Sequence, residues 1–331
     1  MKIFSRIQTQ LLTLLADGAC HSGNELGQLL GVSRTAIWKQ IKQLSSLGVS
    51  IQRIAQTGYQ LEKPIIFLNT KTISQHLHEK GFKKPLQIHL FASINSTNRY
   101  LRELTSSTTM LEVCCAETQT EGRGRFGRTW HSPFGEHIYC STKWRFACDL
   151  SSLSGLSLVV SLAIMATLNT LGVTKQVAIK WPNDILWYEK KLSGCLIEVA
   201  AESNHQAEVI IGIGLNVNDM ALNEPSIDKP YCSLAHITQK QYDRNQLIAT
   251  LIITLCDYIT RFIHEGFSAF INEWHEYDYL KNKPITVFQS SQSIAGIAHG
   301  VNALGQLMLI DQHGHMHYFS SGEVSLSKPH S

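Results

Sequence analysis

The segment at residues 122–128 constrains this chain most strongly, because it holds three glycines and three arginines within seven residues. Glycine lets backbone N–H groups approach a ligand closely and adopts positive φ values at no steric cost. Arginine carries a permanent positive charge on a planar group that suits carboxylate and phosphate oxygens. We therefore expect a loop that binds an anion, with Trp130 just beyond it to stack on a flat ring.

Two nucleotide-binding motifs are excluded for this loop. Gly122, Gly124 and Gly127 spell G-x-G-x-x-G, but the dinucleotide fingerprint needs a helix that opens at the last glycine. Residues 129–135 show no helical period and contain Pro133. The Walker-type phosphate loop fails as well, because no Gly-Lys-Ser/Thr sequence follows.

Length and cysteine content set the broad class. A chain of 331 residues is long enough for two or three domains. The eight cysteines include the neighbours Cys114 and Cys115 but no C-x-x-C, which argues against a zinc ribbon and indicates a reducing compartment. The start of the sequence shows no signal-peptide pattern, and no uninterrupted apolar run reaches the roughly 18 residues of a membrane span. We expect a soluble, cytoplasmic protein without membrane association.

Positive charge is concentrated near the N-terminus. Residues 1–63 hold seven Lys or Arg and three Asp or Glu, a net charge of +4, whereas the whole chain carries +3. A basic head on a nearly neutral body indicates that only the head binds a polyanion.

The head has the pattern of a winged helix-turn-helix. Helical periodicity and caps predict three helices, at residues 7–15, 22–30 and 33–47. Ser22 and Glu25 form a capping box at the start of the second helix, and Gly31 supplies the tight turn after it. Two short strands at residues 49–54 and 58–61 predict a β wing. The pattern is typical of DNA-binding domains.

One face of the third helix is expected to contact DNA. It carries Arg34, Thr35, Trp38, Lys39 and Lys42, opposite the predicted buried stripe. These side chains suit phosphates or base edges, and the sequence does not separate the two. The alternative is a three-helix protein-interaction domain whose charged face meets water.

Beyond a linker at residues 62–64, the body alternates predicted strands and helices. Strands are expected at residues 86–91, 113–117, 137–144, 177–180, 185–188, 192–199 and 208–213, and helices at residues 96–104 and 156–171. Polar residues gather at the ends of these elements: Ser96, Thr97, Asn98, Gln119, Lys180, Asn183, Asp184, Lys191 and Asn216. Taken singly, each has an ordinary interpretation as a helix cap, a turn or a solvated lysine. Together they supply the groups needed for phosphoryl or nucleotidyl transfer.

In this order, the motifs resemble the biotin–protein ligases. They are Ser96-Thr97-Asn98, the loop at residues 122–128, Lys180-Trp-Pro-Asn-Asp184, Lys191-Leu-Ser-Gly194 and Gly212-Ile-Gly-Leu-Asn216. With its helix-turn-helix head, the chain is similar to the bifunctional members that also repress biotin-synthesis genes. The resemblance implies an α+β multidomain fold: a winged helix-turn-helix at residues 1–63, a mixed α/β ligase domain at residues 64–275 and an SH3-like β-barrel at residues 276–331.

The resemblance also implies a reaction and its ligands. Biotin's carboxylate attacks the α-phosphorus of ATP to give biotinyl-5′-AMP, and a lysine of the biotin carboxyl carrier protein then takes the biotinyl group. Biotin, ATP and Mg²⁺ are the implied small molecules. Operator DNA and a second copy of the chain, in a dimer promoted by the ligand, are the further implied partners. We expect the glycine-rich loop to become ordered around the ligand, and this ordering to expose or complete the dimer surface.

The site roles follow from the same resemblance. The catalytic side chains are Lys191, Arg125 and Arg123. Biotin is bordered by Ser96, Thr97, Asn98, Gln119, Arg123, Gly124, Arg125, Lys191 and Gly194. The nucleotide meets Trp130, which stacks on adenine, and Lys180, Asn183, Asp184 and Asn216. Asp184 is the candidate for positioning Mg²⁺.

The tail is predicted to be rich in strands, at residues 285–288, 294–298, 306–310 and 315–319. Family members often carry a basic residue directly after the segment equivalent to residues 322–326. Here Ser327 comes first and Lys328 follows, so the chain departs from that pattern. His313, His315 and His317 alternate in sequence, which raises a metal site as an alternative, but no Cys or carboxylate stands at ligand spacing, and we expect solvent-facing histidines.

Two other functions remain open from the sequence. One is a ligase whose head no longer regulates transcription. The other is a non-catalytic regulator that senses a small carboxylate and therefore has no need of Lys191 or Asp184.

Overall fold

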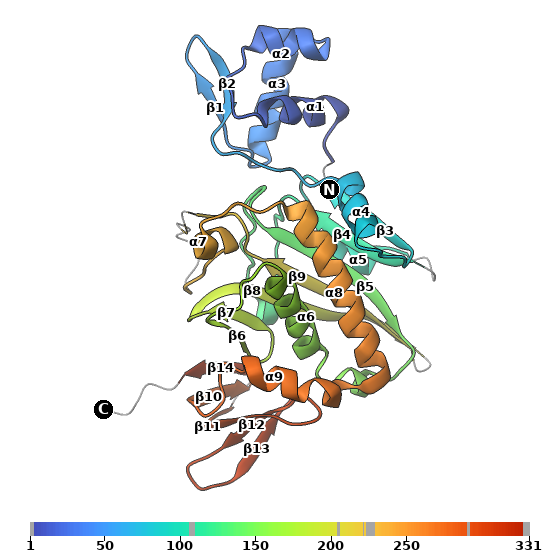
Figure 1. Ribbon diagram of the computed structural model, residues 1–331, viewed down its shortest axis with the longest axis vertical. Coiled ribbons are helices and arrows are strands. Elements are labelled where there is room, and N and C mark those ends of the chain that lie inside the picture. The colour runs from blue at the N-terminus through green and yellow to red at the C-terminus, as the bar shows by residue number, and fades with distance from the viewer. Residues whose placement is uncertain are drawn as a thin grey trace, which may run out of the picture.

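The computed structural model describes residues 3–105, 110–203, 206–220, 222, 229–289 and 292–326. A small head lies at one end of the molecule, a large sheet covered by helices lies in the middle, and a smaller sheet lies at the other end (Figure 1). Ser327 and Lys328, which the sequence singled out, fall outside the described residues.

The head forms the predicted winged helix-turn-helix. It consists of α1 (Arg6–Leu15), α2 (Gly23–Leu30), α3 (Arg34–Ser46), β1 (Ile51–Ile54) and β2 (Gly58–Leu61). Ser22 and Glu25 satisfy each other's backbone N–H groups, as the capping box predicts. Gly31 ends α2 with a φ of 66°, the left-handed conformation that glycine adopts without strain.

The central sheet has seven strands, and every strand predicted in this region is present. Their spatial order is β3 (Leu86–Phe91), β4 (Leu111–Ala116), β5 (Ile138–Phe146), β9 (Gln206–Leu215), β8 (Lys190–Ser203), β7 (Asp184–Trp187) and β6 (Val177–Lys180). Only β3 and β4 are parallel, and the other neighbours are antiparallel. Strands far apart in the sequence therefore meet in the middle of the sheet, where the candidate site lies.

Helices cover both faces of this sheet. The long helices α6 (Leu156–Thr170) and α8 (Arg244–Glu265) pack against each other over one face (Figure 1), and α5 (Thr97–Glu103) covers the other. The vicinal cysteines reflect this layering, because Cys115 joins the core beneath α6 and α8 whereas Cys114 joins the core beneath α5. Neighbouring strand residues point to opposite faces, so the two thiols diverge. The shorter helices are α4 (Thr70–Glu79), α7 (Leu234–Thr238) and α9 (Ile271–Tyr277).

Within the residues that the structure describes, two helical segments are long and apolar enough to cross a membrane by length and composition: residues 150–170, which include α6, and α8. The sequence had indicated no such segment, because short polar residues interrupt both. Just over half of each segment's most apolar window, 56%, is buried inside the protein, and α6 and α8 pack on each other. They are core helices of the central domain.

The described tail forms one antiparallel sheet of five strands. Its order is β13 (Met316–Phe319), β12 (Leu307–Ile310), β11 (Gln292–Val301), β10 (Pro284–Gln289) and β14 (Glu323–Leu326). The four predicted strands are present, and β14 is an addition. Within the described residues, β13 and β14 form the two edges and do not pair to close a barrel.

The head packs on the body through aromatic side chains. Phe134 follows the arginine-rich loop, yet it belongs to the hydrophobic core of the head. Its ring centre lies 6.0 Å from that of Phe4 and 6.4 Å from that of Phe67, and its Cβ lies beside Gly48. The chain segment that carries the loop therefore contacts the winged helix-turn-helix head directly.

Candidate active site and DNA interface

The arginine-rich loop folds back on itself between β4 and β5. Trp130 N–H donates to the Gly122 carbonyl at 2.9 Å, and Gly124 N–H donates to the Arg128 carbonyl at 2.7 Å. One 3₁₀ turn, Arg125–Gly127, forms the tip, where Phe126 has a φ of 56° and is 67% exposed. No helix opens at Gly127, which agrees with the exclusion of a dinucleotide motif.

Arg125 is the loop arginine that turns inward. Its guanidinium donates to Asn183 Oδ1 at 3.3 Å and to the Gly322 carbonyl at 3.1 Å. Burial lowers the pKa of Arg125, while the nearby Asp184 carboxylate opposes that effect. Arg123, in contrast, is exposed on the loop. The structure thus brings together two residues that were predicted for different parts of the site, Arg125 and Asn183.

The tail holds the outer side of the loop. Arg128 forms an ion pair with Glu323 at the start of β14, and Lys229 lies 3.2 Å from the same carboxylate. The hydrogen bond from Arg128 is the main reason that the pKa of Glu323 falls to about 2. Together with the Arg125–Gly322 contact, these pairs join the loop to the C-terminal sheet.

Lys191 and Asp184 form an ion pair beside the loop. Lys191 Nζ lies 2.7 Å from Asp184 Oδ1, and each side chain is about one-third exposed. Lys180 is paired with Asp184 in the register of β6 and β7, so lysines flank this carboxylate on both neighbouring strands. Burial lowers the pKa of Lys180, and Asp184 opposes the effect. Gly194 lies directly under the pair, where a Cβ would come within 3.2 Å of the Asp184 carboxylate.

The indole of Trp130 packs against β9 at Gly214. A Cβ at Gly214 would come within 2.4 Å of the indole ring, so only glycine leaves room for it. Lys191 Nζ lies 5.3 Å from the ring centre, within the range of a cation–π interaction. The indole nitrogen is buried and has no hydrogen-bond partner among the described residues. The structure therefore joins three predicted residues, Trp130, Lys191 and Asp184, at one place.

Thr97 and Gln119 form a second part of the site. Thr97 N–H donates to Gln119 Oε1 at 2.9 Å, and Ser96 caps α5 in front of them. Asn98 points away from this pair toward β8, where it donates to Glu198 at 2.7 Å. Asn98 Oδ1 lies over Gly212, where a Cβ would be only 2.1 Å away. The two glycines of residues 212–214 thus make space for Asn98 and Trp130.

The two predicted nucleotide asparagines also hold the backbone. Asn183 Nδ2 donates to the Cys195 carbonyl at 2.6 Å, and Asn216 Nδ2 donates to the Cys232 carbonyl at 3.0 Å. Asn216 also reaches the Lys191 carbonyl at 3.3 Å. Both side chains therefore fix the strand ends that carry the ion pair of Lys191 and Asp184.

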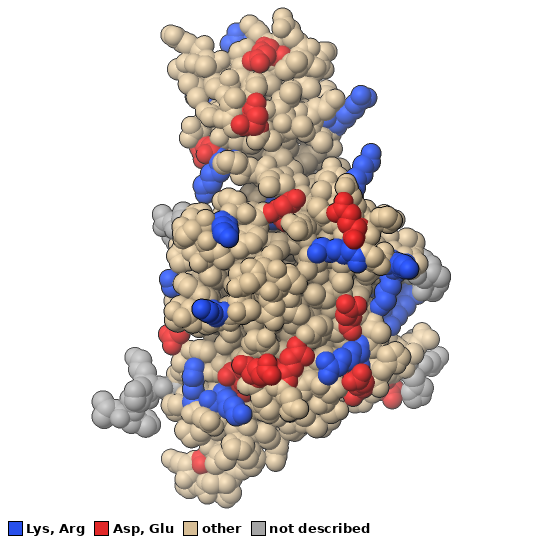
Figure 2. Space-filling model, viewed as in Figure 1, with Lys and Arg blue, Asp and Glu red and all other residues tan. Residues whose placement is uncertain are grey.

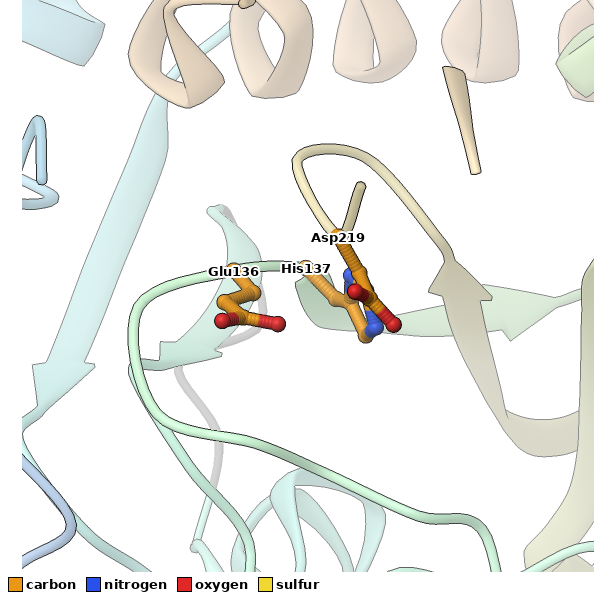
Figure 3. A group of neighbouring side chains, drawn as sticks. All are labelled: Glu136, His137 and Asp219. Atoms are coloured by element: carbon orange, nitrogen blue, oxygen red, sulfur yellow. The ribbon is translucent and has the colours of Figure 1, made fainter. Parts of the chain in front are cut away.

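One group of possible metal ligands, Glu136, His137 and Asp219, lies apart from this site (Figure 3). It is the only group of three His, Cys, Asp or Glu ligand atoms within 4.8 Å of one another in the described part of the chain. Val217 N–H donates to His137 Nδ1 at 3.1 Å, so Nε2 carries the proton of the neutral ring. Burial lowers the pKa of His137 to about 4, which keeps the ring neutral. A protonated Nε2 cannot bind a metal, and we assign the group a structural role.

The third helix of the head presents the predicted DNA-binding face. All five predicted residues are exposed on α3, and Lys42 Nζ lies 5.5 Å from the Trp38 ring centre. On the face of the molecule shown in Figure 2, Lys and Arg alternate with Asp and Glu over the body without a large patch of one sign. The body therefore offers no competing polyanion surface on that face.

Comparison with known proteins identifies the family. Residues 90–216 match the biotin/lipoate A/B protein ligase family, and residues 7–60 match an HTH domain family. The bifunctional ligase/repressor BirA of Salmonella typhimurium is 36% identical over 318 residues, 96% of this chain and 96% of that protein. The protein of the same name from Escherichia coli is 35% identical over 320 residues, 97% of each chain. The chain belongs to the biotin/lipoate A/B protein ligase family.

A solved structure supports the same membership. The biotin protein ligase from Aquifex aeolicus in complex with biotin and ATP is 26% identical, with a TM-score of 0.63 over 73% of this chain and 99% of that chain. The resemblance that the motifs indicated is thus confirmed, and the full-length matches support a biotin ligase with a repressor function.

Some side chains around this ligase site were not predicted from the sequence. They include Ser141 beneath Thr97, Glu198 beside Asn98, Arg128 with its partner Glu323, and the buried ion pair of Glu117 and Arg244 at 2.7 Å. Arg244 also donates to the carbonyls of His137 and Ile66, which ties α8 to the linker and to β5. Arg244 stands in a polar stretch at residues 239–246, so no pattern in the sequence marked it as a buried charge that needs a partner.

Proposed function

We propose that this protein is an ATP-dependent ligase that forms biotinyl-5′-AMP and transfers biotin to a lysine of a biotin carboxyl carrier protein. The convergence of Arg125, Lys191, Asp184 and Trp130 beside the loop carries this proposal. These side chains supply permanent positive charge, a mobile ammonium, a carboxylate and a flat ring. The related Aquifex aeolicus ligase, solved with biotin and ATP, supports the choice of substrates.

The proposed reaction needs charge compensation more than covalent catalysis. Two anions, carboxylate and triphosphate, must meet, and Arg123, Arg125 and Lys191 offset their repulsion. A carboxylate oxygen of biotin forms a bond to the α-phosphorus, the bond to the β-phosphate oxygen breaks, and pyrophosphate leaves. The carrier lysine amine then forms an amide at the biotinyl carbonyl, and AMP leaves. In this arrangement Trp130 stacks on the adenine ring.

We assign ligands to the two parts of the site. Ser96, Thr97, Asn98, Gln119, Gly124 and Gly194 border biotin, and Lys180, Asn183 and Asn216 border the nucleotide. Asp184 provides one carboxylate, which fits Mg²⁺ because that ion is usually held by one or two carboxylates together with substrate phosphates. When bound there, Mg²⁺ would neutralise charge on the phosphates.

We also propose that the head binds operator DNA and represses biotin-synthesis genes in response to biotinyl-5′-AMP. The exposed basic face of α3 and the match to bifunctional ligase/repressors support this role. Because Phe134 follows the loop and packs in the core of the head, a change in the loop on ligand binding would reach the head through this contact. A ligand-promoted homodimer would suit a two-fold operator. The proposed domains are residues 1–63, 64–275 and 276–331, the last an SH3-like barrel, in a cytoplasmic protein.

A direct assay tests the ligase. The protein is incubated with biotin, ATP and Mg²⁺, and biotinyl-5′-AMP is sought by mass spectrometry. A biotin carboxyl carrier protein domain is then added, and its mass should rise by one biotinyl group. A stable complex with biotin that yields no adenylate would favour the non-catalytic regulator instead.

A further inference from the structure

The turn between β12 and β13 gathers histidines around one carboxylate. This hairpin lies at the end of the molecule opposite the head (Figure 1). The sequence had shown His313, His315 and His317 without a carboxylate at ligand spacing. The structure corrects that expectation, because the turn brings Asp311 against two of the three rings. His317 Nε2 lies 2.8 Å from Asp311 Oδ2, and His315 Nδ1 lies 3.5 Å from the same oxygen.

The backbone of the turn fixes this carboxylate in place. Asp311 Oδ1 accepts from His313 N–H at 2.8 Å and from His315 N–H at 3.0 Å. Gly314 completes the turn with a φ of 81°, which glycine adopts without strain. The turn itself therefore needs only Oδ1, and Oδ2 is left to the imidazole rings. Carboxylates that bind metal ions are held by hydrogen bonds in the same way.

His317 does not face solvent as the alternating pattern had indicated. It pairs in register with the buried Leu309, and residues opposite each other on paired strands share a face of the sheet. Its ring stacks on that of Phe319 with 6.4 Å between the ring centres, and its side chain is 31% exposed. The ring of His317 is thus supported from below, at the edge of the core of the C-terminal sheet.

The distances around Asp311 Oδ2 suit a metal ion. Ligand atoms that surround a tetrahedral Zn²⁺ at about 2.0–2.2 Å lie roughly 3.3 Å from one another. The contacts of 2.8 and 3.5 Å lie on either side of this value. No choice of ring nitrogens brings Asp311, His315 and His317 all within 4.8 Å of one another, so one ring must turn to complete the set. His315 can do so, because its side chain is 75% exposed.

We propose that Asp311, His315 and His317 bind one divalent first-row metal ion such as Zn²⁺. Imidazole and carboxylate ligands without a thiolate suit Zn²⁺, Ni²⁺ or Cu²⁺, whereas Mg²⁺ prefers oxygen ligands. His317 binds through Nε2, and the hydrogen of its neutral ring moves to Nδ1. His315 binds through Nδ1 and keeps its hydrogen on Nε2. The ring centre of His313 lies 6.1 Å from that of His315, so His313 is at hand as a fourth ligand.

The ion would join the turn to the strand that follows it. Within the described residues, β13 is an edge strand and pairs only with β12. A ligand that binds only the folded hairpin stabilises it by mass action. Zn²⁺ should therefore slow amide hydrogen exchange at residues 311–317. This site needs neither biotin nor ATP nor DNA, so it stands apart from the proposed ligase and repressor functions.

Calorimetric titration of the full-length protein with zinc chloride tests the proposal. The protein carries no histidine tag, and excess Mg²⁺ is present so that binding at Asp184 is not counted. The wild type should take up one Zn²⁺ at the hairpin. In a parallel exchange experiment, Zn²⁺ should protect residues 311–317 and so show where the ion binds.

Three variants each remove one ligand. Asp311→Asn keeps an oxygen for the two backbone N–H groups of the turn but loses the carboxylate. Asp311→Asn, His315→Ala and His317→Ala should each weaken Zn²⁺ binding by about tenfold or more. His315 is the most exposed of the three side chains, so its loss leaves the folded sheet intact. His299→Ala, which changes an exposed histidine on β11 of the same sheet, is the matched control and keeps the wild-type affinity.

Each possible outcome decides the question. A wild-type protein that binds no Zn²⁺, or one whose exchange slows elsewhere but not at residues 311–317, overturns the proposal. Wild-type affinity in His315→Ala and His317→Ala does so as well. Tenfold losses in these variants with an unchanged His299→Ala protein support it.

Discussion

The side-chain nitrogen of Lys191 lies 2.7 Å from a carboxylate oxygen of Asp184, where β8 pairs with β7. Each side chain is about one-third exposed, so a substrate can reach both. The carboxylate keeps the ammonium in place beside the loop, and Lys191 can exchange that partner for a phosphoryl oxygen. The positive charge of Lys191 is thus already in place, balanced by Asp184, before the anionic substrates meet.

Asp184→Asn should raise the Mg²⁺ concentration needed for half-maximal adenylation by roughly tenfold or more, because one carboxylate ligand is lost. The rate of biotinyl-5′-AMP formation across a Mg²⁺ titration measures this. Asp257→Asn, exposed on α8, is the matched control. An unchanged Mg²⁺ requirement in Asp184→Asn would remove Asp184 from the metal site.

Arg125→Ala should slow adenylation by about 10²–10³-fold, because the variant loses a positive charge that faces the substrates. Arg128→Ala should slow it much less, since Arg128 is committed to Glu323 on the outer side of the loop. Single-turnover rates with saturating biotin and ATP compare the two. Equal losses would mean that the loop acts through its fold alone.

Lys39→Ala should weaken binding to operator DNA and lower the slope of log K against log salt by about 1, if Lys39 neutralises one phosphate. Lys71→Ala, which changes an exposed side chain on α4 of the body, should leave both quantities unchanged. Fluorescence anisotropy at several salt concentrations gives the slopes. Identical slopes for the wild type and Lys39→Ala would place Lys39 outside the interface.

Acid should destabilise the body through His137. Its pKa in the folded protein is about 4 against 6.5 for an ordinary histidine, so the stabilisation is complete above pH 6.5. It is lost as the pH falls from 6.5 toward 4, by about 3 kcal/mol at most. His137→Gln keeps an acceptor for Val217 N–H and should melt with a weaker pH dependence over this window. Melting curves that shift in parallel with the wild type would contradict this account.

Local signals predicted the head well. Ser22, Glu25, Gly31 and Ser33 act within a few residues of the structure that they determine, and the structure has each in its expected place. The strands of the body were found for the same reason. Helix α8 was not, because its many β-branched residues also suit strands and its helical form depends on packing against α6.

The site itself was only partly predictable. Lys191, Asp184, Arg125 and Asn183 belong to short motifs, so the sequence alone indicated their chemistry. Ser141 and Glu198 belong to no motif, and they meet Asn98 only because β5, β9 and β8 lie side by side beneath α5. Such contacts depend on strand order, which no local pattern specifies.

Biotin-dependent exchange of labelled pyrophosphate into ATP tests the central claim most directly. The wild type should exchange only when biotin is present. Lys191→Ala should lose about 10²–10³-fold of this rate, while Lys190→Ala, one residue away, should retain it. Exchange that proceeds without biotin, or at the wild-type rate in Lys191→Ala, would contradict the account.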